Sequence, residues 1–303
     1  MYPWLTQINH ELLLRAQQDQ LHHGILFLAD TGAGEDVLIE NVAKALVCEH
    51  KNACGRCKGC MLFDAQSHPD VQHVVSDKPS IGVDLVRKVS EFVNTTAQLL
   101  HNKVIVIHNI DLMTEAASNA LLKTLEEPSK NTYLLLSTNK PDALLATIKS
   151  RCEKVRVSLP NESDALVWLR EQTQTQVDTA GLRAYSHSPL LYLSALSSNE
   201  LDYHSFSEDL EALCDNKLSS KALAKKWEKH PQQALKWTYQ WSINSLSTAV
   251  TQGRSLSYIN TLSKVSDECI ALSPKMDQAG INKQLVLQRV FNLIQTNRSN
   301  ECL

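Results

Sequence analysis

Four cysteines lie close together in the sequence with a spacing that suits a metal ion. Cys48, Cys54, Cys57 and Cys60 follow the pattern C-x5-C-x2-C-x2-C. Two-residue gaps let successive thiolates reach one ion, and the intervening glycines allow tight turns. Four sulfur ligands select zinc or an iron–sulfur cluster, but a ferredoxin pattern would need another cysteine where this chain has Asp64. The spacing therefore predicts structural zinc with no open coordination position; reduced thiols that only cluster are the alternative.

A glycine-bearing loop has the position, but not the residues, of a phosphate-binding loop. Residues 25–28 (ILFL) have strand length and lead into ADTGAGED at 29–36. The pattern G-x-x-x-x-G-K-[ST], which cradles phosphates in this context, would need Gly at Ala29, Lys at Glu35 and Ser or Thr at Asp36. Since the lysine neutralises phosphate charge and the hydroxyl holds magnesium, two carboxylates in their place are expected to abolish useful ATP affinity. Weak binding through backbone amides alone is the alternative.

Apolar runs alternate with a helical pattern, which predicts a parallel sheet. Residues 104–107 (VIVI) and 133–136 (YLLL) have the length and composition of buried strands. Between them, Thr114 is placed to cap a helix that ends at Glu126-Glu127, just before a proline. Strand, helix, strand in this order is a βαβ unit. Two glutamates at a helix C-terminus are disfavoured by the helix macrodipole. Such local violations are expected more often at functional surfaces than elsewhere, and two solvated glutamates before a proline are the alternative.

Three motifs resemble the clamp-loader branch of the AAA+ ATPases. They are SNALLKTLEEP at 118–128, LLLSTN at 134–139 and SRC at 150–152, within a resemblance that runs from about 20 to 160. The resemblance implies an AAA+ parallel sheet with helices on both faces. ATPases of this family carry Asp-Glu-Ala-Asp where this chain has His-Asn-Ile-Asp at 108–111, so the groups that support magnesium and polarise water are replaced. Asp111 alone is expected to be a turn or cap residue.

The resemblance also implies a role for Arg151 of the SRC motif. In clamp loaders this arginine reaches into the ATP site of the adjacent subunit, where a planar, permanently charged guanidinium can bridge γ-phosphate oxygens. The alternative is an exposed arginine paired with a neighbouring carboxylate such as Glu153. The family carries a zinc module where the four cysteines lie. The implied partners are the gamma/tau ATPase subunits, the delta subunit, the sliding clamp and, through the complex, primer–template DNA.

Length and composition fit a chain of several domains. The 303 residues are 43% hydrophobic and 21% charged, with a net charge of −3, so no global basic field indicates nucleic-acid binding. No apolar run approaches membrane-spanning length and no signal peptide is evident, so a cytoplasmic location is expected. The expected domains are an α/β domain at 1–160 with the zinc module at 48–60, a small helical domain at 161–202 and a helical domain at 203–303. The resemblance implies that the first is AAA+-like, the second lid-like and the third an oligomerisation collar. Core candidates of the collar are Trp227, Trp237, Trp241, Leu246, Val265, Leu285, Leu287 and Phe291.

Three functions fit these features to different degrees. The first is a clamp-loader subunit without catalytic activity of its own, working inside a DNA-directed DNA polymerase (nucleotidyltransferase) holoenzyme. The second is a weakly active AAA+ ATPase, which Glu35 and Asp36 argue against. The third is a zinc-containing DNA-binding module, which lacks an accompanying basic stripe. The first is the prediction that the sequence supports best.

Overall fold

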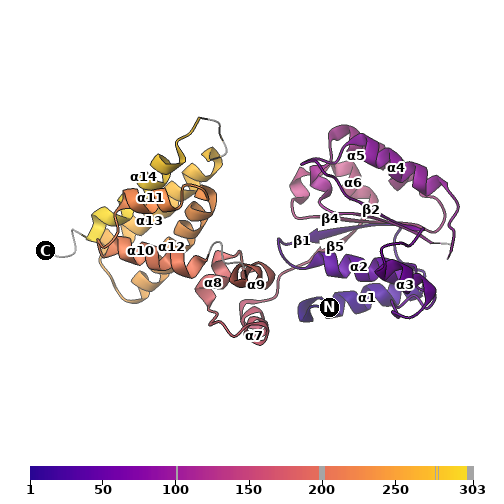
Figure 1. Ribbon diagram of the computed structural model, residues 1–303, viewed down its shortest axis with the longest axis horizontal. Helices are drawn as coiled ribbons and strands as arrows, with labels where there is room; N and C mark the ends of the chain where they lie inside the picture. Colours follow the sequence, from indigo (N-terminus) through magenta and orange to yellow (C-terminus); the bar gives the residue numbers. More distant parts are fainter. Residues whose placement is uncertain (100–101, 198–201, 277, 279, 299–303) are drawn as a thin grey trace. The chain divides into compact units, whose positions relative to one another are not determined.

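The computed structural model describes residues 1–99, 102–197, 202–276, 278 and 280–298. The chain divides into two compact units, Met1–Pro160 and Asn161–Leu303, which Figure 1 draws with their elements labelled. The second unit includes both 161–202 and 203–303, and the division of the chain into three domains stays a prediction. Among the described residues, no helix combines the length and the apolar character needed to span a membrane.

The first unit is an α/β structure. Its elements are η1 (Pro3–Leu5), α1 (Thr6–Gln17), β1 (Gly24–Ala29), α2 (Glu35–Leu46), α3 (Lys58–Asp64), β2 (Val71–Val74), α4 (Val83–Asn94), β3 (Lys103–Ile107), η2 (Ile110–Leu112), α5 (Glu115–Glu126), β4 (Thr132–Thr138), η3 (Pro141–Ala143), α6 (Ala146–Arg151) and β5 (Glu153–Val157). The helix α5 begins as predicted, because Thr114 accepts a hydrogen bond from the Ala117 N–H.

The sheet is parallel throughout, with strand order β2-β3-β4-β1-β5. In register, Ile25 of β1 lies between Leu135 of β4 and Glu153 of β5. Because all strands run the same way, the loops that follow β1, β3 and β4 emerge at one edge, here called the carboxyl edge. The segments that enter β1 and β5 lie at the opposite, amino edge. The predicted fold class, a parallel sheet with helices, is confirmed.

Alternating strand side chains divide the core of this unit into two layers. Ile25 and Phe27 of β1 point to the layer that contains α1 and α2, whereas Leu26 points to the layer that contains α4, α5 and α6. Figure 1 shows the same arrangement, with α4, α5 and α6 on one face of the sheet and α1, α2 and α3 on the other. Strands buried on both faces explain why the sequence shows continuous apolar runs rather than alternation.

The second unit is helical in the part that the structure describes. Its elements are α7 (Glu162–Gln172), α8 (Thr179–Ala184), α9 (Pro189–Ser197), α10 (Tyr203–Cys214), α11 (Ser220–Lys226), α12 (Pro231–Thr251), α13 (Leu256–Leu272), η4 (Ser273–Lys275) and α14 (Lys283–Arg298). One hydrophobic cluster forms around α7, α8 and α9, and a larger one around α10 to α14. Trp237 lies in the larger cluster with Phe206 and Trp227, in edge and tilted ring contacts.

Most of the predicted core residues of this unit are buried, but Leu285 is not. The buried ones are Trp227, Trp237, Val265, Leu287 and Phe291, and Trp241 and Leu246 are partly buried. The side chain of Leu285 is 60% exposed, so its assignment to the core was wrong. Helix α14 buries Leu287, Phe291 and Ile294, and a position two residues before Leu287 lies on the other side of the helix.

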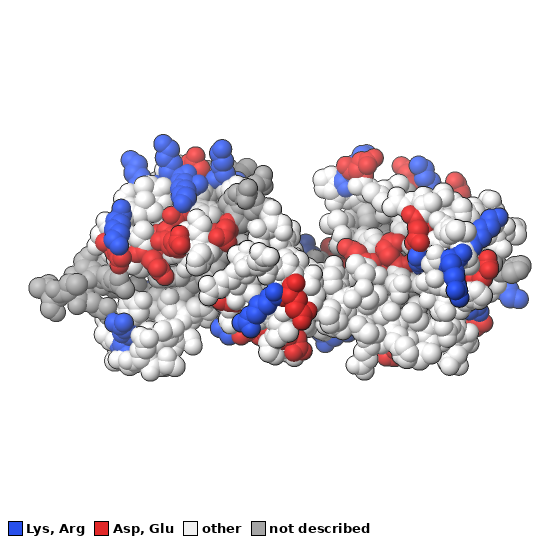
Figure 2. All heavy atoms as spheres, turned by 60° about the horizontal axis from the view of Figure 1, so that its bottom comes forward, with Lys and Arg blue, Asp and Glu red and all other residues white. Residues whose placement is uncertain are grey.

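Acidic and basic side chains are interspersed on the surface. On the face drawn in Figure 2, red carboxylate residues lie among the blue lysines and arginines in both units. This distribution agrees with the small net charge of −3. Any contact with nucleic acid on this face would therefore have to be local rather than the result of a continuous basic field.

Candidate metal centre and phosphate-loop site

The four cysteines predicted as metal ligands come together in the first unit. Cys48 follows α2, Cys54 lies in the next loop, Cys57 caps the N-terminus of α3, and Cys60 lies in the first turn of α3. Their Sγ atoms all lie within 4.8 Å of one another, and all but Cys54 are buried. This group could hold one metal ion. Four soft sulfur donors with no place for a fifth group fit structural zinc.

Backbone N–H groups of the loop point at these sulfurs. The N–H groups of His50 and Cys54 lie 3.4 and 3.5 Å from Cys48 Sγ, and that of Cys60 lies 3.4 Å from Cys57 Sγ. Burial raises the pKa of the Cys48 thiol, but the loop N–H groups outweigh it and lower that pKa to about 6. Donors aimed at sulfur stabilise the thiolate, which is the form that binds metals.

The backbone of the cysteine loop uses glycine once, not twice. Gly55 has a φ of +76°, a left-handed conformation that suits glycine, whereas Gly59 lies inside α3. The expectation that both glycines serve turns is therefore only half right. Lys51 and Ala53 also have positive φ, at 52° and 54°. The loop therefore also places two non-glycine residues in the left-handed conformation, which such residues adopt less readily than glycine.

The loop after β1 lies between a strand and a helix N-terminus at the carboxyl edge, which is the position of a phosphate loop. Gly34, with a φ of 84°, stands at the N-cap of α2. The indole N–H of Trp4 donates to the Ala33 carbonyl at 2.8 Å, and the Asn139 amide donates to Thr31 Oγ1 at 3.3 Å. Residues of η1 and of the segment just after β4 therefore contact this loop.

The two carboxylates that replace lysine and hydroxyl form part of a charge cluster with His108. Asp36 Oδ1 lies 3.1 Å and Glu40 Oε1 4.0 Å from the His108 ring nitrogens, and Ser137 Oγ lies 3.2 Å from Nδ1. Hydrogen bonds to Asp36 and Glu40 raise the pKa of His108 to about 9, and the bond to His108 lowers the pKa of Asp36. Burial raises the pKa of Glu35, which begins α2.

This cluster lies at two positions where the ATPase pattern has other groups. Asp36 stands at the magnesium-hydroxyl position of the phosphate loop, and His108 stands at the first acidic position after β3, so an imidazolium–carboxylate pair replaces two magnesium-supporting groups. Carboxylates in the first turn of α2 also suit the positive end of the helix dipole. Asp111 lies in η2 and accepts a hydrogen bond from Thr138 Oγ1 at 2.7 Å, which fits the turn role predicted for it.

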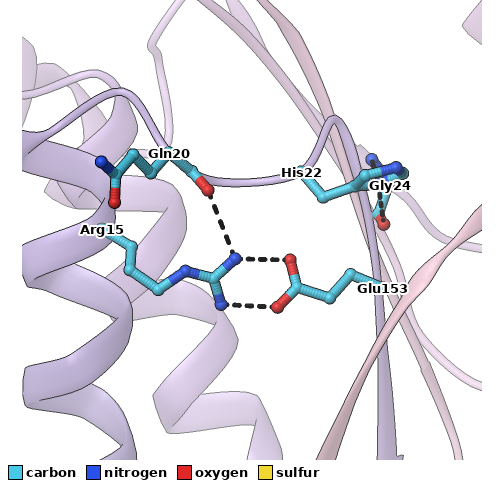
Figure 3. A network of polar contacts seen from close by, with 5 residues as sticks. All are labelled: Arg15, Gln20, His22, Gly24 and Glu153. Carbon is cyan, nitrogen blue, oxygen red and sulfur yellow. Dashed lines mark hydrogen bonds and ion pairs between the residues drawn. The ribbon is translucent and has the colours of Figure 1, made fainter.

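Arg151 is the last residue of α6 and lies at the amino edge. Its Nη2 lies 2.6 Å from Glu126 Oε1, and its Nη1 donates to the Thr147 carbonyl at 3.0 Å. The suggested alternative partner, Glu153, is instead paired with Arg15, at 2.5 and 2.6 Å between the two guanidinium nitrogens and the two carboxylate oxygens (Figure 3). Glu153, given as an example of a partner in the alternative to a finger, is therefore not the partner of Arg151. The pairing with a nearby carboxylate that this alternative expects is present, but it is made by Glu126 at the end of α5.

The structure separates Arg151 from the phosphate loop of its own chain. Arg151 precedes β5 at the amino edge, whereas the loop follows β1 at the carboxyl edge, and β1 and β5 are adjacent parallel strands. Strands of five to six residues hold the two edges about 15–20 Å apart. The structure thus brings the four predicted metal ligands together. It does not bring Arg151 close to the phosphate loop of the same chain.

The His108 cluster makes a prediction about stability and pH. Because the pKa of folded His108 is about 9, above its ordinary value of 6.5, its stabilisation is full below about pH 6.5 and is lost as pH rises through 9. His108→Gln should lower the free energy of unfolding by about 1 kcal/mol at pH 6.5 and by less at pH 10; the effect is modest because the Asp36 side chain is 73% exposed.

Urea unfolding of both proteins across this pH range is the measurement, with His10→Gln, an exposed change in α1, as the control. Equal pH dependence in wild type and His108→Gln would contradict the pairing.

Comparison with known proteins agrees with the fold and the motifs. Residues 5–161 match the family described as DNA polymerase III, delta subunit. The chain is 39% identical over 208 residues to DNA polymerase III subunit delta' of Haemophilus influenzae, a match that covers 67% of this chain and 63% of that protein. It is 40% identical over 196 residues to the subunit delta' of Escherichia coli, covering 62% and 58%. These two matches span less than two thirds of the relatives' own length.

Two further relatives extend over more of the chain. The subunit delta' of Pseudomonas aeruginosa is 34% identical over 262 residues, covering 83% of this chain and 79% of that protein. A DNA polymerase III gamma subunit-related protein from Thermotoga maritima shares the fold, with a TM-score of 0.51 at 17% identity, covering 97% of this chain and 99% of that one. The chain therefore belongs to the DNA polymerase III subunit delta' family.

Proposed function

We propose that this chain is a subunit of the bacterial DNA polymerase III clamp loader, which helps to load the sliding clamp onto primed DNA and hydrolyses no ATP itself. Its partners are the gamma/tau ATPase subunits and the delta subunit, with the clamp and primer–template DNA reached through the complex. Membership of the subunit delta' family supports this role. Polymerisation belongs to the holoenzyme, and this chain contributes Arg151 to the ATP site of a neighbouring subunit.

The position of Arg151 carries the assignment of a role in trans. The guanidinium lies at the amino edge of the sheet, whereas the phosphate loop of the same chain lies at the carboxyl edge, about 15–20 Å away along the strands. An arginine so placed serves a phosphate only when another chain brings that phosphate to it. A guanidinium at the γ-phosphate stabilises the charge that develops on the phosphate oxygens during transfer.

The charge cluster at the phosphate loop supports the absence of ATPase activity. Glu35 replaces the lysine that would neutralise the phosphates, and Asp36 is paired with His108 at 3.1 Å. A triphosphate entering this site would meet carboxylates and would have to displace an existing ion pair. Both effects oppose ATP binding, so hydrolysis in the complex depends on its other subunits.

We also propose that Cys48, Cys54, Cys57 and Cys60 hold a structural zinc ion. With four protein ligands, such a site has no open position for substrate, so the metal would fix the loop between α2 and α3 rather than catalyse. The clustered thiols and the N–H groups aimed at them support this assignment.

One zinc ion per chain is the expected result of elemental analysis on protein purified without chelator. Cys57→Ser should lose most of this zinc while the sheet stays folded, because a serine hydroxyl can still cap α3 by accepting the Cys60 N–H. Cys214→Ser, in the second unit, is the control and should keep the metal. Protein without zinc, or with iron and visible absorbance, would refute the assignment.

Arg151→Ala should leave the assembly of the complex intact but lower its DNA-stimulated ATP hydrolysis and its clamp loading. An arginine finger can contribute roughly 10³–10⁵ in rate at its own site, and the total rate falls by less because the ring has other sites. Arg151→Lys should be impaired nearly as much, because lysine lacks the planar fork.

The measurement is steady-state ATPase and clamp loading by the reconstituted complex. Arg156→Ala, an exposed change in β5, is the matched control. Assembly with wild-type loading by the Arg151→Ala complex would show that the role in trans is wrong.

A further inference from the structure

Glu126 occupies a position that its own helix disfavours. It is the last residue of α5, where the unpaired carbonyl groups form the negative end of the helix dipole. Its carboxylate lies 2.6 Å from Arg151 Nη2, and this contact supplies the positive charge that the helix end lacks. A residue that is locally unfavourable but directed at a functional arginine calls for an explanation beyond solvation.

The backbone that carries Glu126 is held in place by contacts with the start of β1. The ring N–H of His23, just before β1, donates to the Leu125 carbonyl at 3.0 Å. Gly24 packs so closely here that a Cβ on it would lie 2.9 Å from Leu125 Cδ2. The end of α5 is therefore anchored to the entry of the central strand β1, and Glu126 has a defined place at the amino edge.

Arg151 is held at two points, and donors remain for a third group. One guanidinium nitrogen meets Glu126 and the other donates to the Thr147 carbonyl, one turn back in α6. Among its described contacts these use two of the five N–H groups that an arginine carries. The remaining donors can still meet an anion, so the contact with Glu126 and a contact with a phosphate are compatible.

Glu153, another acidic residue at this edge, does not compete with Glu126 for Arg151. Glu153 follows Arg151 by two residues but is paired through both oxygens with Arg15 of α1, which also donates to the Gln20 carbonyl (Figure 3). The two arginines thus have separate carboxylate partners, and Arg151 is directed toward α5 rather than toward the start of β5.

We propose that Glu126 is a positioning residue for Arg151. It fixes the guanidinium before the neighbouring subunit arrives, so that less rotamer freedom is lost when the arginine meets the phosphate. This inference rests on the proposed function in trans. It assigns the positioning role to Glu126 alone and not to the next residue, Glu127.

A double-mutant cycle in the reconstituted complex tests the inference. Glu126→Gln should lower the rate of DNA-stimulated ATP hydrolysis at the site that Arg151 serves by about 3- to 10-fold, since it acts on the chemical step through Arg151. The total kcat should fall by less than it does in Arg151→Ala, with an unchanged KM for ATP. In an Arg151→Ala background, Glu126→Gln should have no further effect, because residues that act as a unit are not additive. Glu127→Gln, at the adjacent exposed position, is the matched control and should match wild type.

The outcomes separate this inference from the proposed function. A low rate in Arg151→Ala together with a wild-type rate in Glu126→Gln would overturn the positioning role and leave the function in trans intact. A wild-type rate in Arg151→Ala would instead overturn the function in trans.

A second readout uses the free chain, with guanidinium ¹⁵N signals assigned by their loss in Arg151→Ala. In the wild type, the contact with Glu126 should hinder rotation of the Arg151 guanidinium and give separate Nη signals. In Glu126→Gln these signals should merge. Signals already merged in the wild type would overturn the inference whatever the complex does.

Discussion

The common direction of the five strands is the constraint on which the arrangement of sites depends. A parallel sheet has two chemically different edges, and a loop that follows a strand cannot lie beside a segment that enters one. In this chain the phosphate loop follows β1, and Arg151 enters β5, its neighbour in the sheet. The fold therefore places the phosphate-loop position and Arg151 at opposite edges of the sheet, and the role in trans that we propose depends on this separation.

At the phosphate-loop edge, an ion pair lies at positions where the ATPase pattern has other groups. Asp36 and His108 replace two groups that would support magnesium, and each substitution is consistent with the other because together they form an ion pair. Trp4 and Asn139 add hydrogen bonds to the loop. Residues of the α/β unit itself thus contact this loop.

The parallel sheet and the cysteine group could be predicted from the sequence, because each depends on residues close in the chain or on a strong pattern. The loss of phosphate-loop chemistry stays a prediction. The pairings were harder. Arg15 meets Glu153 across 138 positions, and Trp4 reaches Ala33 across 29, distances over which local pattern carries no information. Glu126 was not named as the partner of Arg151 for this reason, although its unfavourable place at a helix C-terminus was a signal that could have indicated it. Charge complementarity between Asp36 and His108 was a similar signal.

The central claim is that this chain works on ATP only from outside its own phosphate loop. Isothermal titration calorimetry of the isolated chain with ATP and magnesium tests this most directly, because no partner subunit is present to bind the nucleotide. The account predicts no detectable binding in the sub-millimolar range. A dissociation constant in the micromolar range, about −8 kcal/mol in binding free energy, would contradict it.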